Sequence, residues 1–134
     1  MAGPEADELP IRTEGDIVLV RQAVRARVVA LGFGLVDQTK MITAASELAR
    51  NTLIYGGGGL ARLETLHAGP RTGVRVTFED AGPGIADIEL ALRDGYTTGH
   101  GLGLGLSGAR RLVNEFAIES TAGVGTRVAI TKWK

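Results

Sequence analysis

A run of alternating glycines interrupts the chain and limits what the chain can fold into. Gly99, Gly101, Gly103 and Gly105 occupy every second position, directly before a helical pattern that begins at Leu106. Glycine has no side chain to pack and leaves the backbone free to adopt many conformations. The segment is therefore predicted to be a loop rather than a core element. It separates an N-terminal part, with three predicted helices (the last of them short) and three predicted strands, from a C-terminal part with one predicted helix and two predicted strands.

Composition restricts the class of protein. A length of 134 residues suits a single domain over residues 1–134, and a hydrophobic content of 44% allows a buried core. The 15 basic and 15 acidic residues balance, which argues against binding a nucleic acid through its phosphates. The absence of cysteine excludes disulfides and thiol catalysis. The apolar runs are too short to cross a membrane and the acidic start lacks signal-peptide features, so we expect a cytoplasmic protein.

Apolar spacing predicts an α+β fold. Apolar residues that recur every three or four positions indicate helices, and apolar residues that alternate with polar ones indicate strands. The expected helices span residues 16–31, 37–55, 85–92 and 106–116. The expected strands span residues 11–13, 60–66, 74–78, 117–120 and 127–133, after a flexible lead-in at 1–10. The helices should lie on one face of a mixed β-sheet, with an antiparallel sheet as the alternative, in a two-layer α/β sandwich.

The second predicted helix carries a polar pair at helical spacing. Glu47 and Asn51 lie four residues apart, so their side chains project from one face, beside the apolar stripe that contains Leu48. A carboxylate can orient or deprotonate a nucleophile, and a carboxamide oxygen is a suitable Mg²⁺ ligand. Taken alone, such a pair is more often simply part of a solvated helix face.

A second candidate site follows a predicted strand, in the segment EDAGPG. Asp80 ends the strand, and Gly82 and Gly84 form a turn directly after it. The carboxylate accepts hydrogen bonds only, so it suits an amino-group donor such as the exocyclic amine of adenine. The two glycines would let a ligand approach the backbone closely. The alternative is an aspartate that only caps the turn.

The glycine-rich segment from Gly99 to Gly105 has features of an anion-binding site. Its exposed backbone N–H groups and the following helix start together form a potential phosphate site. The segment lacks the βαβ setting of a dinucleotide-binding loop and the Gly-Lys-Ser/Thr ending of a P-loop. On its own it could equally be a flexible loop.

The order of these motifs resembles a known superfamily. An E-x-x-x-N helix, D-x-G-x-G, G-x-G-x-G-x-G before a helix, and Gly125-Thr126 between two strands are similar to the GHKL (Bergerat-fold) ATPases over residues 36–133. Narrower features, TAASELARN, EDAGPGI, DGYTTGHGLGLGLSGARRLVNEF and GTRVAITKW, resemble the small anti-sigma-factor-type serine/threonine kinases, most closely the stressosome switch kinases.

The resemblance implies a role for each motif. Asn51 would coordinate Mg²⁺ on the phosphates of ATP, and Glu47 would orient or deprotonate the attacking hydroxyl or water. Asp80 would bind the adenine amine, and Thr126 would add a hydrogen bond on the adenine side. Further residues would shape the site: Gly82 would allow close approach, Gly84 would form the turn, and Gly99, Gly101, Gly103 and Gly105 would close over the triphosphate. Arg50 would lie near the phosphates or form an outward salt bridge.

The sequence departs from this family in its cations. No lysine occurs between Lys40 and Lys132, although phosphoryl transfer develops negative charge that a cation besides Mg²⁺ would stabilise. The candidates are Arg93, Arg110, Arg111 and, more weakly, His100. Arg110 and Arg111 could instead face solvent, and a partner protein could supply the missing cation.

The resemblance also implies partners. A kinase of this type would use ATP to phosphorylate a hydroxyl on a STAS-domain stressosome protein and, once released, would activate a downstream phosphatase or other signalling regulator. No nucleic acid and no membrane are expected as partners. The alternative is a nucleotide-gated module that binds proteins with little or no kinase activity, and a free-standing ATP hydrolase is a third possibility.

Overall fold

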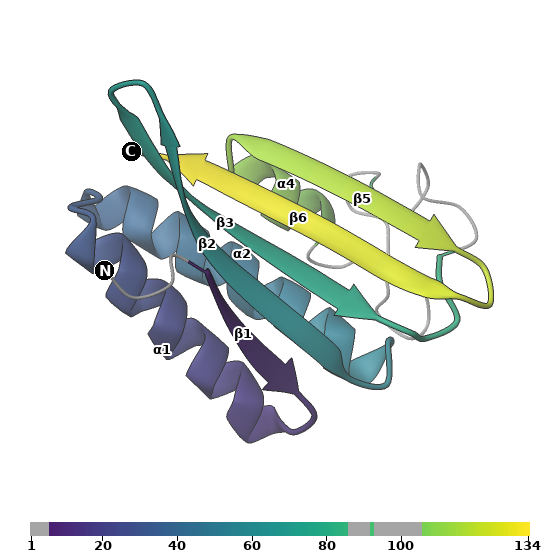
Figure 1. Cartoon of the computed structure of the whole chain (residues 1–134). Coiled ribbons are helices and arrows are strands. Elements are labelled where there is room, and N and C mark those ends of the chain that lie inside the picture. Colours follow the sequence, from purple (N-terminus) through teal and green to yellow (C-terminus); the bar gives the residue numbers. More distant parts are fainter. Residues whose placement is uncertain (1–5, 86–91, 93–105) are drawn as a thin grey trace.

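A β-sheet with helices packed on one face forms the described part of the chain (Figure 1). The computed structural model describes residues 6–85, 92 and 106–134. The strands are β1 (Ala6–Ile11), β2 (Gly59–Ala68), β3 (Arg71–Asp80), β5 (Glu115–Thr121) and β6 (Gly125–Trp133). The helices are α1 (Glu14–Ala30), α2 (Leu35–Ile54) and α4 (Leu106–Leu112). This arrangement confirms the predicted two-layer α+β sandwich.

The sheet is antiparallel rather than mixed. Its order is β1-β2-β3-β6-β5, and every strand pair in the described ranges is antiparallel. Two pairs, β2–β3 and β5–β6, are hairpins, while β1 reaches β2 through the helix pair α1–α2. Strands β3 and β5 run in the same direction, but β6 lies between them and pairs with both. Among the described strands, no two neighbours are therefore parallel.

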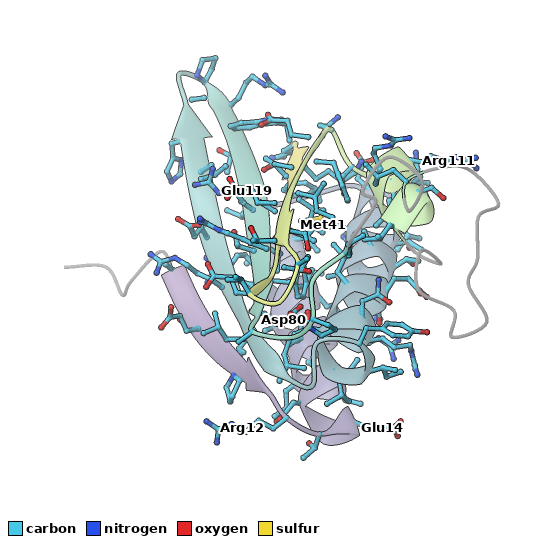
Figure 2. The ribbon with its side chains drawn as sticks, turned by 90° about the vertical axis from the view of Figure 1, so that its right-hand side faces the viewer. Arg12, Glu14, Met41, Asp80, Arg111 and Glu119 are labelled. Carbon is cyan, nitrogen blue, oxygen red and sulfur yellow. The ribbon has the colours of Figure 1, made fainter. Side chains whose placement is uncertain are left out.

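Apolar side chains from both layers form one core between the sheet and the helices. In α1 the buried positions recur every three or four residues, at Ile17, Val20, Val24 and Val28. In α2 the small residues Ala44, Ala45 and Ala49 let this helix lie close to the sheet, between α1 and α4. Figure 2 shows Met41 of α2 between the two layers, and its side chain is fully buried.

The first strand corrects the expectation of a flexible lead-in over residues 1–10 for residues 6–10, and residues 1–5 lie outside the described ranges. Residues 6–11 pair with β2, and Leu9 stands opposite Ala61. Ile11 is fully buried, and Asp7 forms a salt bridge with Arg27 of α1. The strand thus ends at Ile11 instead of occupying residues 11–13 as predicted. Its partners lie in distant segments of the chain, and the local sequence pattern therefore did not indicate it.

The helix after the glycine-rich segment is shorter than the predicted 106–116. It ends at Leu112, and strand β5 begins at Glu115 because Phe116 pairs with Ile130 of β6. The buried Lys132 of β6 also fixes this end, since its Nζ donates to the Leu112 carbonyl at 3.0 Å and lies 3.6 Å from Asp37 of α2. Of the helix predicted over 85–92, the structure describes only residues 85 and 92.

Candidate functional site

A pocket opens between the end of the sheet and the C-terminal half of α2. It encloses about 630 Å³, counting the space at its mouth, which is within the usual size range of small-molecule sites. Helix α2, strands β3 and β6, the turn after β3 and the start of α4 all contribute to its wall. The lining residues are Leu48, Asn51, Thr52, Tyr55, Gly56, Phe78, Asp80, Pro83, Gly84, Ile85, Leu106, Thr126 and Val128.

The sheet contributes two polar groups to this pocket. Asp80 of β3 and Thr126 of β6 are direct neighbours across the strand pair, so both side chains point toward the helices. One step further into the sheet the corresponding pair is Phe78 and Val128, which is apolar and buried. The pocket thus has an apolar floor with an acceptor carboxylate and a hydroxyl at one end, an arrangement that suits a flat ring with polar edge groups.

Asp80 caps a turn and lines the pocket at the same time. Its Oδ1 accepts a hydrogen bond from the Gly82 N–H at 2.9 Å, as in an Asx turn. This bond fixes the carboxylate, and within the described ranges Oδ2 has no hydrogen-bond partner. Figure 2 shows Asp80 at the end of the central strand β3, next to the turn that follows it. The two readings of Asp80 from the sequence are therefore compatible.

The glycines near Asp80 allow backbone segments to pack closely. A Cβ placed on Gly82 would lie 2.8 Å from the Cα of Gly56, just after α2. A Cβ on Gly56 would lie 2.6 Å from Oδ2 of Asp80. Gly84 has a φ of +76°, which side chains rarely adopt. In the structure, Gly82 therefore brings the turn against the end of α2, and Gly84 supplies the positive φ of this segment.

The helical wall supplies a polar group without a partner. The Nδ2 atom of Asn51 is buried and has no hydrogen-bond partner within the described part of the chain. A buried N–H group without a hydrogen-bond partner lowers stability. A half-turn of the carboxamide exchanges Nδ2 and Oδ1, so the same position can offer a donor or an acceptor. Asn51 thus has the chemistry to bind a polar ligand group in the pocket.

Glu47 borders the pocket without lining it. It lies one helical turn before Asn51, is half-buried, and has no hydrogen-bond or ion-pair partner among the residues that the structure describes. The predicted pair therefore does share one side of α2, but only Asn51 reaches the described pocket wall.

The predicted site residues are partly brought together. Asn51, Asp80, Gly84 and Thr126 line one pocket although up to 75 residues separate them in sequence, and Gly82 is bonded to Asp80. The predicted lid, Gly99, Gly101, Gly103 and Gly105, lies outside the described residues.

The predicted cations contribute little to the described pocket. Arg110 Nη2 is 3.4 Å from the Leu92 carbonyl and donates to it, and Arg111 is exposed on α4 (Figure 2). Arg50 is exposed and makes no ion pair within the described ranges, so the outward salt bridge is not found there. Arg93 and His100 lie outside these ranges.

Several lining residues were not predicted. Tyr55 and Gly56 follow α2, while Ile85 follows the turn after β3, and only the three-dimensional arrangement brings them to the pocket. A signal existed for Gly56, because it begins a run of four glycines at the end of the predicted helix. Leu106 is the first described residue after the glycine-rich segment, and it lines the pocket.

The described ranges contain no group of three His, Cys, Asp or Glu side chains that could hold a metal ion. A cation at Asn51 would therefore need most of its ligands from elsewhere, and Mg²⁺ commonly takes them from substrate phosphates and water.

Among the described helices, none is long and apolar enough to span a membrane.

Fold and site together define a family. Residues 36–134 match the model of the histidine kinase-, DNA gyrase B- and HSP90-like ATPases. The chain belongs to this family, and the predicted GHKL resemblance is confirmed.

Relatives within the family narrow the class. The chain is 46% identical, over 92% of both lengths, to the serine/threonine-protein kinase RsbT of Bacillus subtilis (strain 168). It is 35% identical, over 68% of its own length and 66% of the relative's, to an anti-sigma F factor of Thermoanaerobacter sp. (strain X514). By this similarity the chain is a protein serine/threonine kinase, and the predicted likeness to this kinase type is confirmed.

Solved structures share the fold at low identity. The RsbU and RsbW domains of Rv1364c from Mycobacterium tuberculosis superpose with a TM-score of 0.67 at 20% identity. The match covers 99% of this chain but only 34% of that one. The mycobacterial sensor histidine kinase MprB superposes with a TM-score of 0.59 at 16% identity, over 95% of this chain and 96% of that one.

Proposed function

We propose that the pocket binds Mg²⁺–ATP and that the chain transfers the γ-phosphoryl group to a serine or threonine hydroxyl of a STAS-domain protein. The observation that carries this proposal is that Asp80, Thr126 and Asn51 line one pocket, where the buried Asn51 Nδ2 has no hydrogen-bond partner among the described residues. The family supports ATP as the nucleotide, and the 46% identical kinase supports the reaction.

At the sheet end, the apolar floor of Phe78 and Val128 suits a purine ring. Asp80 Oδ2 would accept a hydrogen bond from the adenine amine, because Asp80 lines the pocket and the turn engages only its Oδ1. Guanine has a carbonyl oxygen in place of that amine, and two acceptors in contact repel. This end of the pocket, at Asp80 and Thr126, is called the base end below, and it therefore favours ATP over GTP.

At the helix end, Asn51 would supply its Oδ1 to the cation. When bound, Mg²⁺ would neutralise negative charge on the phosphates. The Asn51 carboxamide in the pocket wall fits this role, since Mg²⁺ sites of this kind take one or two protein oxygens and complete their shell with phosphates and water. The glycine-rich segment from Gly99 to Gly105 would close over the triphosphate, because Leu106 directly after it lies in the pocket wall.

Glu47 would act as the general base. It would accept the proton of the substrate hydroxyl while that oxygen forms a bond to the γ-phosphorus. The bond from the γ-phosphorus to the β–γ bridging oxygen breaks, and ADP leaves with that electron pair. Its place one turn before Asn51 suits this role, because the hydroxyl must approach beside the metal-bound phosphates. The proton then passes from Glu47 to water.

The proposal extends to partners. A STAS-domain stressosome protein would be the substrate, and release from it would let the kinase activate a downstream phosphatase or signalling regulator. Similarity to RsbT and to anti-sigma factors supports a partner-switching role. We place this activity in the cytoplasm, where ATP is supplied.

Two substitutions test the proposal with labelled ATP, Mg²⁺ and a purified STAS-domain stressosome protein. Glu47→Ala should lower phosphate transfer by about 10²–10⁴-fold, the usual contribution of a general base, while calorimetric ATP binding stays unchanged. Asp80→Asn should weaken ATP binding by about 10- to 100-fold, as expected for a hydrogen bond to a charged group.

The matched controls are Thr43→Ala, exposed on the same helix, and Glu79→Gln, which precedes Asp80 and pairs with Arg127 at 3.2 Å on the outer face of the sheet. Neither control should change transfer or binding. Unchanged ATP affinity in Asp80→Asn would mean that the adenine site is misplaced. ATP binding without any transfer by the wild-type chain would favour the nucleotide-gated binding module.

A further inference from the structure

A hydroxyl cluster lies beside the base end of the pocket and extends one strand beyond it. Ser120 of β5 stands directly opposite Thr126, and Thr126 stands opposite Asp80. Paired residues point to the same face of a sheet, so these three side chains form a polar row on the helix-covered face. The neighbouring row toward the core is apolar and consists of Ala61, Phe78, Val128 and Ile118.

Ser120 connects three segments of the pocket wall through one oxygen atom. Its Oγ accepts from the Ile85 N–H at 2.7 Å and lies 2.8 Å from Thr126 Oγ1 and 3.2 Å from the Gly125 carbonyl oxygen. A serine hydroxyl has one proton and two lone pairs. Because the Ile85 N–H occupies one lone pair, the Ser120 proton points either to Thr126 or to Gly125.

The choice between these two partners decides what Thr126 offers to a ligand. When Ser120 donates to Gly125, Thr126 donates to Ser120 and presents only lone pairs to the pocket. When Ser120 donates to Thr126, the Thr126 proton is available to the pocket. The distances allow both arrangements, so the cluster satisfies its hydroxyls without a ligand and can reverse its direction when one binds.

We propose that Ser120 is a specificity-determining positioning residue that directs the Thr126 proton into the pocket. Asp80 then accepts and Thr126 donates, directly or through one water, side by side on adjacent strands. This pair matches a base with an amine donor next to a ring-nitrogen acceptor. Adenine has that pattern with N1 or N7 beside its amine, whereas guanine presents a carbonyl in place of the amine. The inference rests on the proposed ATP site and adds a residue that acts through Thr126.

The test measures calorimetric dissociation constants for ATP, 1-deaza-ATP and 7-deaza-ATP. The wild-type chain should bind one deaza analogue about fivefold more weakly than ATP, the effect of one neutral hydrogen bond. Ser120→Ala should remove that difference by weakening ATP more than the analogue. Thr126→Val should do the same, and the double variant should lose no further selectivity because both residues act on one contact.

Three further variants serve as references. Ser120→Thr keeps the hydroxyl and should retain the selectivity for ATP. Ser120→Cys preserves the shape of serine with a weak donor, so it replaces Ser120→Ala if that variant does not fold. Glu119→Ala changes the preceding residue, which lines a groove on the other face of the sheet, and should leave all three dissociation constants unchanged.

The outcomes separate this inference from the proposed function. Failure of the wild-type chain to bind ATP would overturn the proposed function. Equal binding of ATP and both analogues by the wild-type chain would overturn the inference but leave the ATP site intact. The inference would also be wrong if Ser120→Ala weakened all three nucleotides equally, because Ser120 would then only stabilise the turn at Ile85.

Discussion

At the scale of single residues, the pocket depends on a glycine, Gly56, at a position where no side chain would fit. Gly56 lies against Asp80, and a Cβ there would come within 2.5 Å of the Asp80 Cβ and 2.6 Å of Oδ2. Asp80 cannot yield without breaking its hydrogen bond to the Gly82 N–H. The Asp80 carboxylate is thus fixed by two contacts. The Gly82 N–H donates a hydrogen bond to it, and the backbone of Gly56 packs directly against it.

Gly56→Ala should therefore damage the base end of the pocket. Displacing the carboxylate removes a hydrogen bond to a charged group, so we expect ATP affinity to fall about tenfold or more, measured by calorimetric titration. Overpacking should also lower the free energy of unfolding by about 1–3 kcal/mol. The control is Gly57→Asn, because Gly57 has a φ of +74° in open space and asparagine tolerates that conformation. Full ATP affinity in Gly56→Ala would contradict the placement of Asp80 in the base site.

At the scale of elements, α1 begins with a reciprocal cap. Thr13 Oγ1 accepts from the Asp16 N–H at 3.2 Å, and Asp16 Oδ2 accepts from the N–H groups of Arg12 at 2.8 Å and Thr13 at 3.1 Å. The hydrogen bond from the Arg12 N–H is the main reason why the pKa of Asp16 is lowered from its ordinary value of 3.8. This cap joins the end of β1 to the start of α1.

The cap makes part of the stability dependent on pH. Because the pKa of Asp16 is lower in the folded chain than in the unfolded chain, its contribution is complete above pH 3.8 and is lost as the pH falls through the folded value. Asp16→Asn should lower the urea midpoint at pH 7, and its difference from wild type should shrink toward pH 3. Thr13→Ala should cost about 1 kcal/mol at pH 7. A difference between wild type and Asp16→Asn that stays constant over this pH range would show that the carboxylate does not cap the helix.

Elements with a strong local pattern could be predicted from the sequence, and those held by distant contacts could not. The spacing of Ile17, Val20, Val24 and Val28 is itself the buried stripe of α1, so the helix was predictable. Strand β1 lacks such a pattern, since its pairing with β2 and the buried Ile11 depend on residues far along the chain. The same holds for the site, where motif spacing indicated Asn51 and Asp80 but the row that adds Ser120 exists only after β5 and β6 pair.

At the scale of the whole molecule, the pocket connects the two parts that the glycine-rich segment separates. Its wall combines α2 and β3 from the N-terminal part with α4 and β6 from the C-terminal part. Strand β6 lies between β3 and β5 in the sheet, so the C-terminal hairpin cannot detach without opening the pocket. A ligand bound there must therefore stabilise both parts together.

Nucleotide binding should for this reason raise the midpoint of one shared thermal transition. At a ligand concentration about 100 times its dissociation constant, binding adds about 2.7 kcal/mol to the free energy of unfolding. A chain of this length has an unfolding entropy of about 0.28 kcal/mol/K, so ATP with Mg²⁺ should raise Tm by about 10 °C in calorimetry. The same concentrations should give a much smaller rise in Asp80→Asn, and GTP should have little effect on the wild-type chain. An equal rise for both nucleotides would show that the pocket does not read the base, and two transitions of which only one moves would show that it does not join the two parts.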